Sequence, residues 1–191
     1  MGWIRCCGSS GGPSPEVKEP ALLTFINNSS RIVLPVKGSD NFKFVFKAMS
    51  LKRSGEGCIL ATAWSGSAFL FISVNSQWRY NGYRTASIYA NMSASGYDDI
   101  ELTNSYMKVN GTTYNLAAVT SHDSYFKILG YEGGDACTAS IGIVDIYIDD
   151  ILTYKMEPRE VNGVCGLYDT INDVFYAPET GSFADVIYID S

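Results

Sequence analysis

The sequence is short of positive charge and of long apolar runs. Lysine and arginine number 14 against 20 aspartate and glutamate residues, which leaves a formal net charge of −6. Nucleic-acid binders present a basic patch, and the only local cluster of basic residues here is the brief one at 47–53. No run approaches the ~20 apolar residues that a membrane span needs, and no apolar signal region follows Met1. We therefore expect neither nucleic acid nor a membrane span among the functions of this chain.

Histidine is almost absent. His122 is the single one, and Ser121 and Asp123 flank it in a polar stretch. A catalytic triad is assembled in space from separate segments, so three neighbours in sequence are a weak signal for one. A hydrogen-bonding loop is the default interpretation of this stretch.

Cysteines are few and scattered. The five cysteines are Cys6, Cys7, Cys58, Cys137 and Cys165. An odd number at irregular spacing predicts no disulfide framework, and none lies at metal-ligand spacing with the histidine. The last three sit among apolar residues and are expected to be small core side chains in a chain that folds in a reducing cytoplasm.

Aromatic residues and glycine are plentiful. There are 13 Tyr, 9 Phe, 3 Trp and 18 Gly, a composition that favours pleated strands separated by turns. Asn-Gly, Asp-Asp and Ser-Gly-Ser turn signals separate short runs with the alternating pattern of strands. The expected strands are 22–26, 31–36, 42–49, 58–64, 68–74, 77–80, 85–89, 100–102, 106–109, 112–116, 125–131, 140–148, 151–156, 164–168, 173–176 and 183–189. Regularly spaced short strands predict an all-β fold, a sandwich or a barrel.

The N-terminal segment differs in composition from the rest. Residues 1–7 mix apolar and basic side chains, residues 8–20 are rich in Gly, Ser and Pro, and the domain is expected to span 21–191. A non-globular peptide with apolar side chains before a flexible linker suggests an anchor that docks into another protein, and a merely disordered start is the alternative. The anchor candidates are Trp3, Ile4, Arg5, Cys6 and Cys7.

The C-terminal third carries the most specific pattern. Pro158-Arg159 precedes Gly166-Leu167-Tyr168-Asp169, Asn172-Asp173-Val174-Phe175-Tyr176 and Thr180-Gly181-Ser182-Phe183. This resembles the closing segment of laminin-G/concanavalin-A-like jelly-roll domains found in bacteriophage structural proteins and in surface proteins of gut bacteria, although Ala177-Pro178-Glu179 departs from that pattern. The resemblance implies a two-sheet antiparallel jelly-roll sandwich and names no catalytic residue. The residues expected to form the fold-closing turn are Gly166, Tyr168, Asp169, Asn172, Phe175, Tyr176, Gly181 and Phe183.

Two pairs of carboxylates and one aromatic group are the candidates for chemistry. Asp98-Asp99 and Asp149-Asp150 are expected to be turn residues, with Asp98 and Asp99 as weak calcium candidates and no other cofactor or metal. Glycosidases of the jelly-roll class place two carboxylates on strands, and the apparent lack of such a pair disfavours a hydrolase. The candidates for stacking on a sugar ring are Trp64, Trp78, Arg79, Tyr80 and Tyr83, with a core or subunit-interface role as the alternative.

Together these features suggest a non-enzymatic virion structural protein of a bacteriophage. The jelly roll would be displayed on the capsid or tail for adhesion to a host or mucosal glycan. Its N-terminal peptide is expected to bind other virion proteins. The chain is expected to form a homo-oligomer, specifically a trimer. A secreted or cell-surface carbohydrate-binding module of a gut bacterium is the first alternative, and a small glycoside hydrolase is the second.

Overall fold

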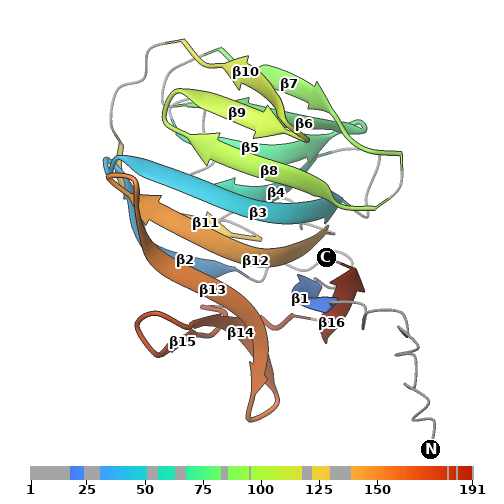
Figure 1. Cartoon of the computed structure of the whole chain (residues 1–191), viewed down its shortest axis with the longest axis vertical. Coiled ribbons are helices and arrows are strands. Elements are labelled where there is room, and N and C mark those ends of the chain that lie inside the picture. The colour runs from blue at the N-terminus through green and yellow to red at the C-terminus, as the bar shows by residue number, and fades with distance from the viewer. Residues whose placement is uncertain are drawn as a thin grey trace, which may run out of the picture.

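The chain folds into two antiparallel sheets that face each other (Figure 1). The computed structural model describes residues 18–23, 31–50, 56–62, 68–82, 86–94, 96–117, 122–129, 139–179, 181–183 and 185–190. Within these ranges there are sixteen strands and no helix, and hence no helix that could cross a membrane. Each segment expected to be a strand overlaps one of the sixteen. The two-sheet jelly-roll sandwich is confirmed.

The larger sheet has ten strands. Its main path runs in the order β10 (Thr112–Asn115), β9 (Tyr106–Val109), β8 (Asp98–Thr103), β3 (Phe42–Ser50), β12 (Ala139–Ile148), β13 (Ile151–Val161), β14 (Val164–Asp169) and β15 (Val174–Tyr176). β1 (Lys18–Leu23) pairs with the start of β12 and with β16 (Asp185–Asp190).

The smaller sheet has six strands. Their order is β2 (Ile32–Gly38), β11 (His122–Ile128), β4 (Glu56–Ala61), β5 (Leu70–Val74), β6 (Gln77–Asn81) and β7 (Ile88–Asn91).

Period-two alternation fixes which face of each strand meets the core. In β3, Phe42, Phe44, Phe46 and Ala48 are buried, and the residues between them are half-buried on the opposite face. Aromatic rings fill the space between the sheets: the Phe42 and Phe126 rings meet edge to face with centroids 4.8 Å apart. Such edge contacts add to the stabilisation that burial of the rings already provides.

The tight hairpins occur where the sequence carries residues that tolerate a positive φ. Asn110-Gly111 joins β9 to β10 with φ of 49° and 81°, and Asp149-Asp150 joins β12 to β13 with φ of 51° and 62°. Two consecutive positive φ values match the twist of the flanking strands. Asp149 and Asp150 are therefore turn residues, as predicted.

The fold-closing turn is organised around the buried carboxylate of Asp169. Its oxygens accept hydrogen bonds from the backbone nitrogens of Lys155 (3.1 Å) and Ile171 (3.0 Å) and from the Asn172 amide (2.6 Å). The Asn172 amide also donates to the Thr153 carbonyl at 3.1 Å. These bonds fasten the β14–β15 turn to β13, which explains why Asp and Asn stand at this spacing.

Two further residues of the closing segment have a visible packing role. The Arg159 guanidinium lies 3.9 Å from the centre of the Tyr168 ring, a cation–π contact between β13 and β14. Gly166 lies so close to β15 that a Cβ there would meet the Tyr176 carbonyl oxygen at 2.5 Å. Phe183 is buried in the core, as predicted.

The domain starts earlier than expected. β1 begins at Lys18, inside the segment expected to be linker up to Pro20. The reason is backbone pairing, because β1 runs antiparallel to β16 from Lys18 opposite Asp190 to Leu23 opposite Asp185. The composition of residues 8–20 predicts a flexible linker. Pairing with β16 places residues 18–20, the last three of that segment, in a strand.

Candidate functional site

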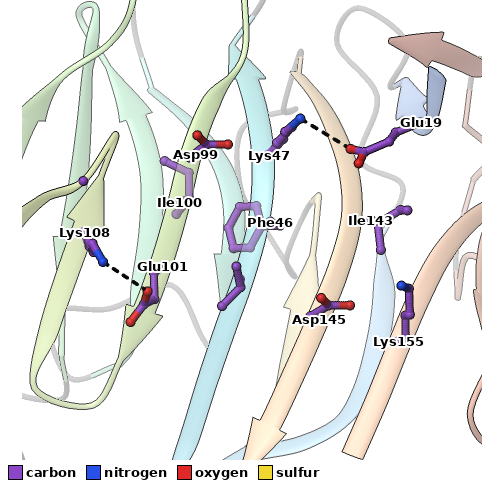
Figure 2. A pocket seen from close by; sticks show the side chains of 12 residues that line it. Glu19, Phe46, Lys47, Asp99, Ile100, Glu101, Lys108, Ile143, Asp145 and Lys155 are labelled. Carbon is purple, nitrogen blue, oxygen red and sulfur yellow. Dashed lines mark ion pairs between the residues drawn. The ribbon is translucent and has the colours of Figure 1, made fainter. Parts of the chain in front are cut away.

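The outer face of the ten-stranded sheet carries a groove of about 410 Å³ (Figure 2). It is lined from β1, β3, β8, β9, β12 and β13, and therefore runs across the strands. Charged residues dominate the lining, namely Glu19, Lys47, Asp99, Glu101, Lys108, Asp145 and Lys155. Val45 and Ile143 add apolar surface.

A single cross-strand row builds the centre of this groove. Lys108 on β9 stands opposite Glu101 on β8, Glu101 opposite Val45 on β3, Val45 opposite Asp145 on β12, and Asp145 opposite Lys155 on β13. Directly opposed residues in antiparallel strands share a face of the sheet. The row thus places an apolar residue between two carboxylates, with a lysine at each end.

A fork in the sheet forms one side of the groove. β12 pairs along one edge first with β1, through Leu22 and Leu23, and then with β13 from Val144 onwards. Along its other edge, a register shift between Ile141 and Val144 leaves a bulge opposite Lys47. β1 lies beside this part of β12, and Glu19 of β1 lines the groove.

Two of the three lysines in the groove already have carboxylate partners. Lys47 Nζ lies 3.5 Å from Glu19 Oε2, and Lys108 Nζ lies 3.8 Å from Glu101 Oε2. Figure 2 shows both ammonium groups turned toward these carboxylates. The Tyr106 hydroxyl also donates to Glu101, and this bond, together with burial, raises the pKa of Tyr106 to about 12.

Asp145 and Lys155 face each other without forming an ion pair. Asp145 Oδ1 is buried and has no hydrogen-bond partner within the described part of the chain. A buried acceptor without a donor costs on the order of 1–3 kcal/mol. A ligand that brings a donor to this carboxylate would offset that cost, so Asp145 Oδ1 is the unsatisfied atom among the described groove residues.

The structure corrects the proposed glycan-stacking residues. Trp78 and Tyr80 are only 0% and 1% exposed, because both point inward from β6 into the core. The Trp78 ring stacks on Phe71 with centroids 5.1 Å apart, and the Tyr80 hydroxyl donates to the Thr103 carbonyl at 2.8 Å. The core alternative is therefore right for these two rings.

Of the three remaining stacking candidates, the structure describes only Arg79. Arg79 is half-buried on the outer face of β6, in the sheet opposite the groove. Trp64 and Tyr83 lie outside the described residues, as do the anchor residues Trp3, Ile4, Arg5, Cys6 and Cys7.

Asp98 and Asp99 are strand residues, not turn residues. They open β8 and point to opposite faces, so they cannot share one calcium ion. Asp98 is buried and accepts from Trp78 Nε1 (2.7 Å), Asn110 Nδ2 (2.6 Å) and the Ser93 hydroxyl. In the described part of the chain, no group of three or more metal-ligating side chains is placed to hold an ion.

The argument against strand carboxylates also fails. Asp99 and Glu101 stand two residues apart on the groove side of β8, and Asp145 faces them from β12. The sequence does not reveal this group of carboxylates, because the pattern around Asp99 predicts a turn and Asp145 lies within the expected strand 140–148. Alternation in residues 143–148 predicts that Asp145 points away from the core. It does not predict which residues of the neighbouring strands lie beside Asp145.

His122 and Asp123 lie on β11, so this part of the expected hydrogen-bonding loop is a strand. The Asp123 carboxylate accepts a 2.7 Å hydrogen bond from Lys37 Nζ on β2, which lowers the pKa of Asp123. Ser121 lies outside the described residues.

The two described cysteines differ in exposure. Cys58 is fully buried, and burial raises its pKa to about 12, while Cys165 is half-buried. The expected core role is therefore right for Cys58 and only partly right for Cys165, and Cys137 lies outside the described residues.

Comparisons with known proteins point to the same architecture. No protein-family model and no curated protein matches the chain. Among solved structures, domains LG4-5 of the mouse laminin alpha1 chain match with a TM-score of 0.52 at 11% identity, over 86% of this chain and 50% of that one. The galectin LEC-6 of Caenorhabditis elegans gives 0.39 at 13% identity, over 62% of this chain and 94% of that one. A SAP-like pentraxin of Limulus polyphemus gives 0.46 at 9% identity, over 95% and 92%.

These likenesses concern the fold alone, and of the three structures named here the laminin domains exceed a TM-score of 0.5. This chain spans half the length of that laminin segment. The order of the strands, the two antiparallel sheets and the laminin match agree with one another. The chain has the laminin-G-like, concanavalin-A-like jelly-roll fold.

Proposed function

We propose that this protein is a glycan-binding adhesion module of a bacteriophage virion, and that the groove across the ten-stranded sheet is its binding site. The observation that carries the proposal is the buried Asp145 Oδ1, which has no hydrogen-bond partner among the described residues, at the wall of a 410 Å³ groove. Fold likeness does not identify a ligand. The chemistry of the groove therefore has to support the choice.

A saccharide fits this chemistry. Sugar hydroxyls both donate and accept hydrogen bonds, so one saccharide can donate to Asp145 through one hydroxyl and accept from Lys155 through another. Val45 lies between the two carboxylates of the row and offers an apolar surface to the C–H face of a ring. Trp78 and Tyr80 are buried in the core, so the groove offers the sugar an aliphatic floor with charged walls.

A binding experiment tests the site. Wild-type protein and the double variant Asp145→Ala/Lys155→Ala are applied to an array of bacterial-surface and mucin glycans. We expect the wild type to retain one glycan class and the double variant to lose it. Asp150→Asn is the matched control, because Asp150 is an exposed hairpin carboxylate outside the groove and Asn tolerates its φ of 62°. An array without signal for the wild type would contradict the proposal.

Virion attachment is proposed from the sequence. The peptide 1–7 and the following Gly/Ser/Pro-rich segment precede β1, and the closing segment resembles that of phage structural proteins. Deleting residues 1–12 leaves β1 intact, so we expect the truncated domain to fold and to be absent from purified particles. Incorporation of the truncated chain at the wild-type level would contradict the anchor.

Binding without turnover and self-association complete the proposal. Prolonged incubation with each retained glycan should release no reducing ends, and hydrolysis that is lost in the Asp145→Ala/Lys155→Ala variant would overturn the non-enzymatic role. Sedimentation equilibrium tests the homotrimer. A monomer at all concentrations would contradict it.

A further inference from the structure

The dimensions of the groove bear on the shape of its ligand. The row from Lys108 to Lys155 crosses five strands. Neighbouring strands lie about 4.8 Å apart, so its ends are separated by about 19 Å. We infer that the ligand is an extended, uncharged oligosaccharide that lies across the strands, an inference that rests on the proposed function and adds the class of ligand to it.

The two ends of the row explain why the ligand is extended. A single sugar over Val45 reaches Glu101 on one side and Asp145 on the other. It leaves Lys108 and Lys155, one strand further out on each side, without contact. Additional sugar units on both sides of the central one bring hydroxyl acceptors to these ammonium groups.

The charges of the groove explain why the ligand is uncharged. Four carboxylates and three lysines line it, and Lys47 and Lys108 are already paired with Glu19 and Glu101. Among the described residues, the charged side chains of the groove that have no ion-pair partner are then Asp99, Asp145 and Lys155. A sulfated or uronate-rich chain would bring further negative charge to a groove with an excess of carboxylates, in a protein whose net charge is −6. Neutral hydroxyls meet no such repulsion.

Calorimetric titration with saccharides of known length tests both parts of the inference. The neutral probes are the cello-, malto-, manno- and xylo-oligosaccharides from monomer to hexamer. The anionic probes are oligogalacturonates and heparin-derived fragments of the same lengths. We expect affinity for one neutral series to rise with length and then level off, and the anionic probes to bind more weakly than neutral ones of equal length.

Variants locate the two ends and the centre. Lys108→Met and Lys155→Met should each lower the affinity for the long members of the series roughly three- to tenfold, the loss of about one hydrogen bond, and leave the shortest binding member unchanged. Val45→Glu should abolish binding at every length. Asp150→Asn serves as the control and should bind like the wild type.

The outcomes separate the two proposals. A short saccharide that binds as tightly as the hexamer would overturn the extended ligand, and tighter binding of the anionic fragments would overturn the uncharged one. In both cases a glycan-binding groove would stand, provided that Val45→Glu removes the binding. Absence of binding by all neutral and anionic probes would overturn this inference, and the array described above then decides whether the proposed function fails with it.

Discussion

The indole nitrogen of Trp78 donates a 2.7 Å hydrogen bond to the carboxylate of Asp98 across the core of the sandwich. Trp78 lies on β6 of the six-stranded sheet and Asp98 on β8 of the ten-stranded sheet. A second bond, from the Tyr80 hydroxyl to the Thr103 carbonyl at 2.8 Å, joins the same two strands. Because buried polar groups are costly without partners, these bonds select one relative placement of the two sheets.

Removing this carboxylate should destabilise the domain. Asp98→Ala removes the carboxylate that accepts from Trp78 Nε1 and from the Ser93 hydroxyl. We expect the free energy of unfolding to fall by on the order of 3 kcal/mol in urea denaturation. Asp99→Ala, one residue along but on the outer face, should change it by less than about 0.5 kcal/mol. Equal losses for the two variants would contradict an inter-sheet role for Asp98.

The contribution of Asp98 should depend on pH. Burial by itself raises the pKa of Asp98, but hydrogen bonds from Ser93, Trp78 and Asn110 outweigh burial and lower it below its ordinary 3.8. Because the pKa of Asp98 is lower in the folded state than in the unfolded state, its ionised carboxylate stabilises the fold. This stabilisation is complete above the unfolded-state pKa of about 3.9 and is lost as the pH falls through the folded-state pKa. The stability gap between wild type and Asp98→Asn should therefore be widest near neutral pH and shrink toward about pH 3. Urea denaturation across this range measures the gap, and a constant gap would refute the assignment.

The contrast between Trp78 and Asp145 shows what the sequence could and could not predict. Alternation in segments such as 42–49 identified the strands, and turn residues such as Asp149 and Asn110 identified the hairpins, because both signals are local. The same alternation placed Trp78 and Tyr80 on one face of a strand without saying whether that face meets the core. Whether it does depends on the opposing sheet, which is contributed by residues far away in sequence.

The groove could not be predicted for the same reason. Two of the four contacts in its row join residues far apart in the sequence, because Val45 pairs with Glu101, 56 positions away, and with Asp145, 100 positions away. Each of the four contacts also depends on register. The bulge opposite Lys47 includes Gly142, and a glycine inside a strand indicates a bulge but not the residue that it faces. The fold-closing turn was predictable because Asp169 accepts hydrogen bonds from the Ile171 backbone and from the Asn172 side chain, both close to it in sequence.

Gly166 should be intolerant of a side chain. A Cβ at this position would lie 2.5 Å from the Tyr176 carbonyl oxygen and 2.7 Å from the Phe175 ring. Gly166→Ala must therefore displace β15, and we expect a loss of about 1–3 kcal/mol in the free energy of unfolding, measured by urea denaturation. Gly142→Ala is the control, because its Cβ would have its nearest contact at 3.4 Å. A Gly166→Ala protein as stable as the control would show that β15 is not held against β14 as described.

Asp145 is expected to lower the stability of the ligand-free domain, because its carboxylate is positioned for a ligand. Asp145→Ala removes a buried carboxylate oxygen that has no donor among the described residues. We expect the thermal midpoint of the variant without ligand to equal or exceed that of the wild type, while glycan binding is lost. Scanning calorimetry gives the midpoint. A clear drop would mean that Asp145 stabilises the fold and is not held ready for a ligand.

The location of ligand contacts on the two sheets tests the central claim most directly. Backbone amide spectra of ¹⁵N-labelled protein are recorded by NMR while a saccharide retained on the array is added. The groove account predicts that the largest shift changes fall on Val45, Glu101 and Asp145, in neighbouring strands of the ten-stranded sheet. Changes confined to the six-stranded sheet, around Arg79 and Tyr89, with those three amides unmoved, would contradict it.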